Sequence, residues 1–155
     1  MRIIDNFLSE NDCDFLIDYH KGFHTLDNYD SQFLVHMKDT PLYNLRKSWI
    51  RYWYLRRIRK DFSLKLNYDQ IVHWPPNSDK MMHKDGSFKE NNDWTSVCYL
   101  NDDFEGGETL IEDKSIKPKK GTLVVFPSKK MNHGVSLVKS RARYTYIAWW
   151  QQKLK

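Results

Sequence analysis

The second half of the chain is a series of short strand-like runs, and this pattern limits the fold more than any other feature. The runs are rich in β-branched and aromatic residues and recur at a spacing of roughly 8–12 residues, which is typical of a sandwich or barrel. They cover residues 66–74, 94–100, 108–112, 122–126, 135–138 and 143–150. Turn-forming segments separate them, among them Pro75-Pro76-Asn77, Gly106-Gly107 and Asn132-His133-Gly134.

The first half has the pattern of two helices. Residues 9–12 can cap a helix that Gly22 ends. A second helix is expected after Thr40-Pro41, with apolar positions at Leu42, Leu45, Trp49 and Trp53. We interpret these aromatic side chains as core residues that pack against a sheet, rather than as a surface on which nucleic-acid bases stack.

Helices followed by antiparallel strands favour an α+β, mainly β fold. We predict a double-stranded β-helix, or jelly roll, with the N-terminal helices packed on one outer face. The length of 155 residues fits one domain, residues 1–155, because single domains commonly have roughly 100–150 residues.

The cellular setting is inferred from the cysteines and from the apolar runs. Cys13 and Cys98 are far apart and form no CxxC pair, which is typical of a reducing compartment. No apolar run approaches the roughly 20 residues that span a bilayer, and the N-terminus has no signal-peptide pattern. We therefore expect a cytoplasmic protein that makes no membrane contact.

The net charge of +5 is concentrated in residues 46–60, which hold seven cationic side chains and no acid. We interpret this segment as the solvated face of one helix. The alternative is a patch for an acidic partner, with nucleic acid the less favoured ligand.

The chemistry is predicted from His83-Lys84-Asp85 and the distant His133. On an extended backbone, His83 and Asp85 project to the same face while Lys84 points away. His133 lies in a strand-turn context from which a facing strand could supply a third ligand. Two histidines and one carboxylate on one face of an octahedron are typical of non-haem Fe(II) oxygenases.

A cationic residue follows the second histidine at a regular distance. Arg143 comes ten residues after His133 and by alternation shares a strand face with Thr145, Ile147 and Trp149. A buried guanidinium needs an anion, and a dicarboxylate co-substrate would supply one. Arg141 lies on the same face and is the competing candidate.

Several fragments, taken in order, resemble the prolyl 4-hydroxylase-type branch of the 2-oxoglutarate/Fe(II) oxygenases. The likeness covers nearly the whole chain. The matching fragments are Ile3 to Ser9, His83 to Asp85, Cys98 to Asn101 with Gly106 to Thr109, Pro118 to Gly121 with Val124 to Phe126, and His133 to Val138 with Arg143 and Trp149. Each fragment alone is weak, but together at compatible spacings they are specific.

The resemblance implies a role for each matching residue. His83, Asp85 and His133 would bind Fe(II), and these residues with Arg143 would form the catalytic set. Arg143 would bind the distal carboxylate of 2-oxoglutarate (2OG), with a hydrogen bond from Tyr99, and O2 would be the oxidant. The resemblance also allows a need for ascorbate in sustained turnover. Trp149 would line the cavity near the substrate.

The sequence departs from the family pattern on the substrate side. Trp74, which we also expect to line the cavity near the substrate, stands where the family often has a tyrosine before the proline turn. Lys80-Met81-Met82 replace the aromatic residue usual before the metal motif. The expected reaction is hydroxylation of a C–H bond, with peptidyl proline as the leading substrate. The alternatives are a free amino acid or other small molecule as substrate, and a non-catalytic, cupin-like metal- or ligand-binding jelly roll.

Overall fold

The computed structural model of the chain describes residues 1–22, 33–37, 45–86 and 91–154. Within these residues, six strands form an antiparallel major sheet in the order β1-β9-β5-β12-β3-β2. The strands are β1 (Arg2–Ile4), β9 (Leu123–Phe126), β5 (Trp94–Tyr99), β12 (Arg143–Gln152), β3 (Leu64–Trp74) and β2 (Phe33–His36). The longest pairing joins β12 to β3, and it sets Arg143 opposite Trp74.

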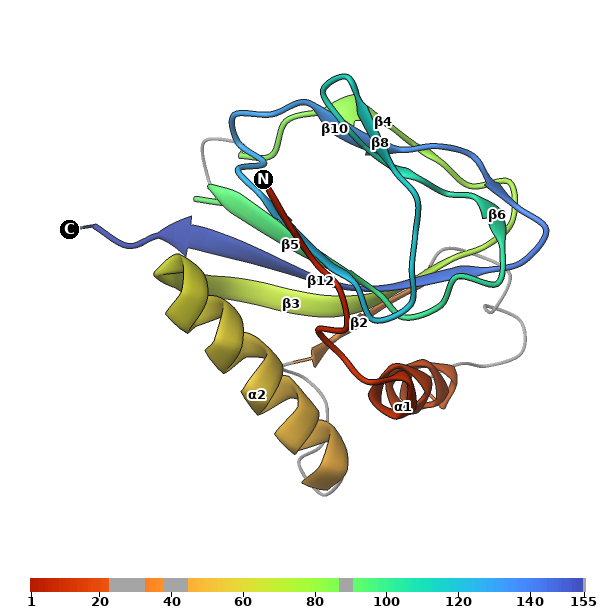
Figure 1. Cartoon of the computed structure of the whole chain (residues 1–155), viewed down its shortest axis with the longest axis horizontal. Helices are drawn as coiled ribbons and strands as arrows, with labels where there is room; N and C mark the ends of the chain where they lie inside the picture. The colour runs from red at the N-terminus through yellow and green to blue at the C-terminus, as the bar shows by residue number, and fades with distance from the viewer. Residues whose placement is uncertain (23–32, 38–44, 87–90, 155) are drawn as a thin grey trace.

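A four-stranded minor sheet lies against the major sheet (Figure 1). Its order is β4 (Lys80–His83), β10 (His133–Val135), β7 (Thr109–Ile111) and β8 (Lys114–Ile116). A short ribbon pairs β6 (Glu105–Gly106) with β11 (Val138–Lys139). Two facing antiparallel sheets give the predicted jelly roll, and this prediction is confirmed.

The major sheet separates two hydrophobic cores because its side chains alternate between its faces. One face packs against the helices through residues such as Ile71, Tyr146 and Trp150. The other face packs toward the minor sheet through residues such as Val97 and Phe126. The active-site candidates lie on this second, inner side.

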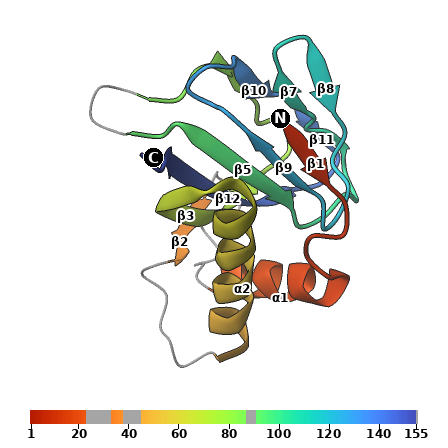
Figure 2. The same ribbon diagram turned by 60° about the vertical axis from the view of Figure 1, so that its left-hand side comes forward.

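Both helices lie on the outer face of the major sheet, opposite the minor sheet (Figures 1 and 2). Helix α1 (Glu10–Lys21) begins as predicted, with Ser9 Oγ accepting a hydrogen bond from the Asp12 N–H at 3.1 Å, and ends at Gly22. Helix α2 is Leu45–Phe62. The expected start at Thr40-Pro41 lies outside the described residues.

The predicted packing of α2 is wrong for its tryptophans. Trp49 and Trp53 are 57% and 49% exposed and stand beside exposed Tyr52, whereas Ile50 and Ile58 are buried. Ile50, Tyr54 and Ile58 form a second stripe at the same helical spacing, and this stripe faces the sheet. Periodicity alone could not choose between the two stripes.

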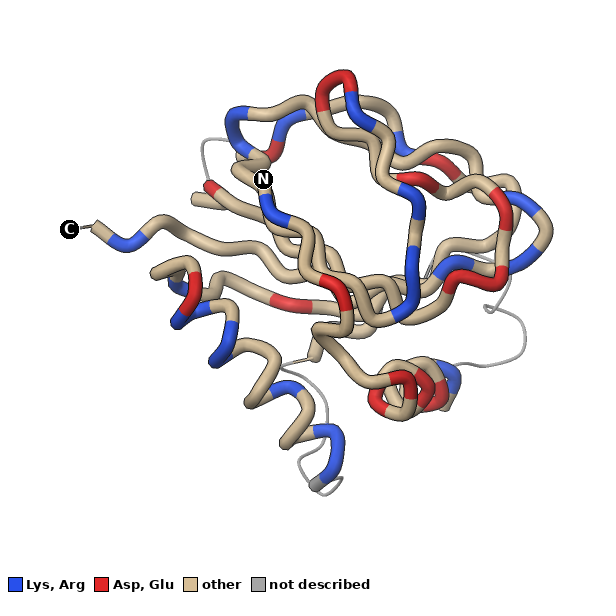
Figure 3. The backbone as a smooth tube through the Cα atoms, in the orientation of Figure 1, with Lys and Arg blue, Asp and Glu red and all other residues tan. Residues whose placement is uncertain are grey.

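The basic segment 46–60 is not one uniform solvated face. Figure 3 shows lysines and arginines along most of α2. Arg51 forms a two-pronged ion pair with buried Asp69, at 2.8 and 2.9 Å, and Arg57 donates to the Phe7 carbonyl at 2.7 Å. Lys47 is buried over the ring of Tyr19. Part of the charge therefore holds α2 onto the rest of the fold.

The strand predictions differ from the structure mainly at the ends of the strands. The run 135–138 was expected to be one strand, but it spans the end of β10, a turn and the start of β11. The short strands β4, β6 and β8 contain lysine, glutamate or glycine and carry little strand signal. Both cysteines are free and buried. In the described part of the chain, no helix is long and apolar enough to cross a membrane.

Candidate active site

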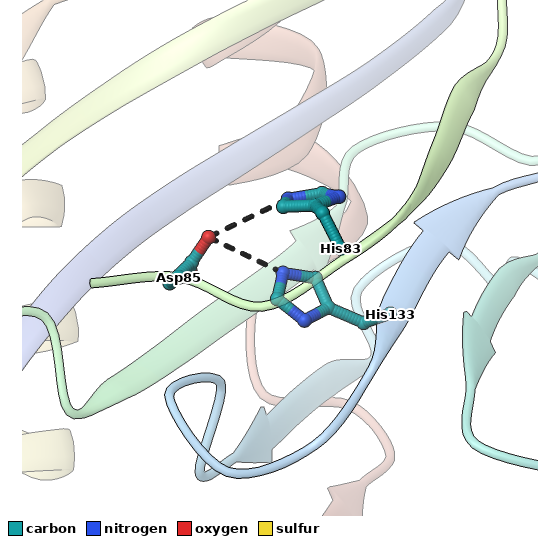
Figure 4. Close-up of side chains that lie close together, drawn as sticks. All are labelled: His83, Asp85 and His133. Atoms are coloured by element: carbon teal, nitrogen blue, oxygen red, sulfur yellow. Dashed lines mark ion pairs between the residues drawn. The ribbon is translucent and has the colours of Figure 1, made fainter. Parts of the chain in front are cut away.

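Three predicted metal ligands converge between the two sheets. His83 ends β4, His133 begins β10 directly opposite it, and Asp85 follows β4 by two residues. Figure 4 shows both imidazole rings turned toward the Asp85 carboxylate. Lys84 is exposed and points away, as alternation predicts.

The donor atoms are close enough to share one divalent ion. Asp85 Oδ1 lies 3.5 Å from His83 Nε2 and 3.4 Å from His133 Nε2. All three donor atoms fall within 4.8 Å of one another. Two ligands at right angles around a first-row metal ion are about 3.0 Å apart, so a small inward shift would suit them.

Backbone carbonyls select the ring nitrogen that each histidine presents. His83 Nδ1 lies 2.7 Å from the Met81 carbonyl oxygen, and His133 Nδ1 lies 3.0 Å from the Met131 carbonyl oxygen. In each ring, Nδ1–H therefore donates to the carbonyl, and Nε2 keeps its lone pair for a metal ion.

The Asp85 carboxylate is held in place through its other oxygen. Oδ2 accepts hydrogen bonds from the Thr95 hydroxyl at 2.8 Å and from Trp149 Nε1–H at 3.1 Å. The Asp85 N–H donates to the Ser128 carbonyl at 3.0 Å. Burial by itself would raise the pKa of Asp85, but the neighbouring His133 side chain and the hydrogen bond from Thr95 lower it to about 2. Asp85 is therefore a carboxylate with Oδ1 free to bind a cation.

Arg143 is buried at the inner end of the same cavity. Its Nε–H donates to the Gly107 carbonyl at 2.9 Å, and Nη2–H donates to Thr109 Oγ1 at 3.2 Å. Its Nη1 is buried without a partner. Burial lowers the pKa of Arg143 to about 10, so the group is still a cation at neutral pH. A buried cation with an unpartnered N–H group is a site for an anion.

Arg141, the competing candidate, faces solvent. Its side chain is 71% exposed and lies 3.4 Å from Asp103. Gly107 leaves room for the buried Arg143 side chain, because a Cβ at position 107 would meet the Arg143 Cδ at 3.0 Å. The φ of +65° at Gly107 also favours glycine.

The remaining predicted residues surround Arg143 and Asp85. The Trp74 and Tyr99 rings lie 5.3 and 5.6 Å from the Arg143 guanidinium carbon. Trp74 Nε1 is buried and unpartnered, whereas the Tyr99 hydroxyl donates to Thr109 Oγ1 at 2.5 Å. Trp149 lines the cavity as expected, but its hydrogen bond to Asp85 and its stacking on Tyr68 were not anticipated.

A cavity of about 300 Å³ joins the three donor atoms to Arg143. Its walls are mostly apolar, and they include Val72, Val97, Phe126 and Ile147. Sequence reasoning missed several polar residues of the site: Gln70, Lys80, Thr95 and Thr109. Only the position of Thr109 just after Gly106-Gly107 gave any signal of such a role.

The fold and the site together define a class of protein. A jelly roll with two histidines and one carboxylate facing an apolar cavity has the donor set typical of non-haem Fe(II) oxygenases. The sequence model of the 2OG-Fe(II) oxygenase superfamily matches residues 64–151, which is more than half of the chain. The protein belongs to this superfamily, which is named for the Fe(II) ion and the 2OG that its members use.

Several proteins that this chain resembles in sequence or in structure are prolyl hydroxylases. Prolyl 3-hydroxylase 2 of Homo sapiens is 38% identical over 65 residues, which are 37% of this chain and 9% of that protein. The chain thus spans about a tenth of the length of the curated relatives that it matches. The viral collagen prolyl hydroxylase of Paramecium Bursaria Chlorella virus-1 is similar in structure, with a TM-score of 0.74 at 22% identity, over 98% of this chain and 96% of that chain. A Pseudomonas putida prolyl-4-hydroxylase has the same TM-score at 17% identity, over 99% of this chain and 92% of that chain.

Proposed function

We propose that this chain is an Fe(II)- and 2OG-dependent hydroxylase of peptidyl proline. One observation carries the proposal: the donor atoms of His83, Asp85 and His133 face the same cavity as the buried Arg143. A metal site needs the first three residues, but only an anionic co-substrate explains the fourth.

In this proposal, Fe(II) is held by His83 Nε2, His133 Nε2 and Asp85 Oδ1. The Met81 and Met131 carbonyls fix both imidazoles, and Thr95 and Trp149 fix the carboxylate. Three ligands on one side leave the other positions of the ion open to a co-substrate and O2.

The distal carboxylate of 2OG would bind at the inner end of the cavity. Arg143 Nη1 and Trp74 Nε1 are buried donors without partners, and a carboxylate would satisfy both. Tyr99 reaches the same region, where Thr109 links its hydroxyl to Arg143. Because the Tyr99 hydroxyl donates to Thr109, it can donate to 2OG only after this hydrogen bond breaks.

When bound, Fe(II), 2OG and O2 together supply oxidative decarboxylation of 2OG to succinate and CO2, with the second oxygen atom inserted into a substrate C–H bond. The chain contributes orientation and a dry cavity. Val97, Phe126 and Ile147 give the cavity apolar walls, which would keep water away from the reacting groups. If ascorbate is required, we expect it to be required only for sustained turnover.

Peptidyl proline is the proposed substrate because the named relatives are prolyl hydroxylases. We favour C4 of the ring, by analogy with the prolyl-4-hydroxylase whose fold this chain shares along its length. A free amino acid is the alternative. A non-catalytic, cupin-like module has no use for a buried guanidinium, and Arg143 argues against it.

The free, buried cysteines Cys13 and Cys98 support a reducing compartment, and we propose a cytoplasmic location. Fractionation of cells that express the chain would test this, and recovery from an oxidising compartment with the thiols paired would contradict it.

The test is succinate formation with Fe(II), 2OG and a library of proline-containing peptides. We expect succinate to form together with a mass increase of one oxygen atom, and NMR of the product would separate C3 from C4 hydroxylation. Asp85→Ala and His83→Ala should abolish both signals while circular dichroism stays unchanged. Normal succinate formation by either variant would refute the ligand assignment.

A further inference from the structure

Two cationic side chains line the cavity at different depths. Arg143 is 1% exposed and lies at the buried end, whereas Lys80 lines the cavity and is exposed, which places it at the mouth. Asp85 is the one acidic residue among the described residues that line the cavity. The cavity therefore carries more positive than negative charge.

A β-bulge turns Lys80 toward the cavity. Strands β4 and β10 pair His83 with His133 and Lys80 with Val135, so three steps along β4 oppose two steps along β10. Paired residues on antiparallel strands point to the same face, and Val135 lines the cavity. Without the extra residue, alternation would place His83 and Lys80 on opposite faces.

The close approach of the two strands depends on Gly134. A Cβ at this position would meet the Lys80 carbonyl oxygen at 2.6 Å. A larger residue would therefore push β4 away and move Lys80 with it. The pairing of β4 with β10 thus sets the face of the sheet from which the Lys80 side chain projects.

Lys80 has no anionic partner in the part of the chain that the structure describes. None of the ion pairs among these residues includes it. The charges of Asp85, Arg143, a divalent metal ion and a dicarboxylate co-substrate cancel one another. Among the described residues, the charge of Lys80 therefore has no counterpart in the loaded site, which leaves it available to the substrate.

We propose that Lys80 forms a carboxylate-binding subsite at the mouth of the cavity and selects substrates with an acidic group next to the hydroxylated residue. This inference rests on the proposed hydroxylase function and names its substrate class. Because Lys80 is exposed, its pairing with a carboxylate should be weaker than a buried ion pair and should weaken further in salt.

The carboxylate could come from two sources. It could be the side chain of an aspartate or glutamate that flanks the target proline in a peptide. It could also be the main-chain carboxylate of a C-terminal or free proline. The shared chemistry is one carboxylate near the reacting ring, and matched substrates separate the two sources.

The experiment compares proline peptides that differ by one residue, Asp against Asn, at each position within two residues of the target proline. C-terminally free and amidated peptides and free proline complete the set. Binding is measured by fluorescence anisotropy with Mn(II) and 2OG in the absence of O2, and hydroxylation is measured by mass. The variants are Lys80→Gln, Lys80→Glu and Lys114→Glu, the last on exposed β8 away from the cavity.

We expect the wild-type protein to bind the better acidic substrate about twofold to fivefold more tightly than its neutral match. Lys80→Gln should remove this preference, and Lys80→Glu should favour a lysine-bearing peptide instead. Lys114→Glu makes the same change in net charge and should keep the wild-type preference.

The failures of the two proposals are distinguishable. Hydroxylation with equal affinity for acidic and neutral substrates in both wild type and Lys80→Gln overturns the subsite alone. An equal loss of preference in Lys114→Glu overturns it as well, because the effect would then be one of net charge. If no proline substrate in the set is hydroxylated and none raises succinate formation, both proposals are overturned.

Discussion

Asp85 divides its two carboxylate oxygens between two tasks. Oδ1 faces the histidines, while Oδ2 is tied to the major sheet through Thr95 on β5 and Trp149 on β12. A ligand held in this way loses little freedom when a metal ion binds, because its orientation is already fixed. We therefore expect Trp149 to act as a positioning residue for the proposed metal site.

Replacing Trp149 should weaken metal binding. Trp149→Phe removes the N–H donor to Asp85 and keeps a ring that can stack on Tyr68. We expect the Kd for Mn(II) to rise by about tenfold to a hundredfold, as is usual when a ligand loses its outer hydrogen bond. The control is Trp94→Phe, whose indole donates to Gln152 at the surface. Equal Mn(II) affinities in the two variants would show that Trp149 only lines the cavity.

Arg143 and Arg141 form a matched pair for testing the co-substrate site. Arg143→Ala should raise the KM for 2OG at least about tenfold, because a charge-assisted hydrogen bond is worth about 1.5–3 kcal/mol. Arg141→Ala makes the same change in net charge at an exposed position and should leave the KM unchanged. Steady-state kinetics with varied 2OG measure both values, and an unchanged KM in Arg143→Ala would exclude it as the 2OG anchor.

At the scale of single residues, spacing predicted which side chains meet but not how they are held. The His83-Lys84-Asp85 pattern and the distant His133 named three residues that do converge, although their role as ligands stays a prediction. Alternation put Arg141 and Arg143 on one face, and only the spacing from His133 favoured Arg143, which the structure buries while Arg141 is exposed. The contacts of Thr95 and Trp149 with Asp85 are long-range, and no local pattern reports them.

Among the elements, α2 has two apolar stripes and buries only one. Ile50, Tyr54 and Ile58 pack into the core, while Trp49, Tyr52 and Trp53 remain on the surface. The exposed rings contact one another, with centroids 5.2–6.0 Å apart, and Arg56 lies over Trp53. Besides its buried stripe, the helix is held by the ion pair from Arg51 to Asp69, which also accepts a hydrogen bond from Tyr146.

Stability measurements should separate the two stripes. Ile58→Ala should lower the free energy of unfolding by about 2–5 kcal/mol, because Ile58 is fully buried and the substitution leaves a cavity. Trp53→Ala removes a larger side chain from a half-exposed position and should cost less than about 1 kcal/mol. Urea unfolding followed by circular dichroism measures both. A loss in Trp53→Ala as large as that in Ile58→Ala would place the tryptophan in the core after all.

Strand lengths explain which elements could be predicted from sequence. The long runs at β3 and β12 were predicted to within two residues at one end and correctly at the other, since many alternating apolar positions support each. Strands of two to four residues, such as β6 and β4, carry too few positions for alternation to show. The bulge that turns Lys80 inward also lies in one of these short strands.

The whole molecule has three layers: the helices, the major sheet and the minor sheet. Alternation and the helix-then-strand order predicted these layers, but not the pairing of strands distant in sequence, such as β1 with β9. The minor sheet contributes both histidines, and Asp85 links them to the major sheet. A metal ion bound by all three residues would therefore join the two sheets.

Metal binding should then protect the backbone amides of β4 from hydrogen exchange more than those of β8. Any opening of β4 breaks the site, so at a metal concentration a hundredfold above Kd its amide exchange should slow by about a hundredfold, equivalent to about 2.7 kcal/mol. Strand β8 lies in the same sheet, pairs only with β7 among the described strands and holds none of the three residues, so local opening there should change little. Hydrogen exchange with and without Mn(II) measures both strands, and Asp85→Ala should abolish the difference. An equal response of β4 and β8, or protection that persists in Asp85→Ala, would mean that the ion binds elsewhere on the chain.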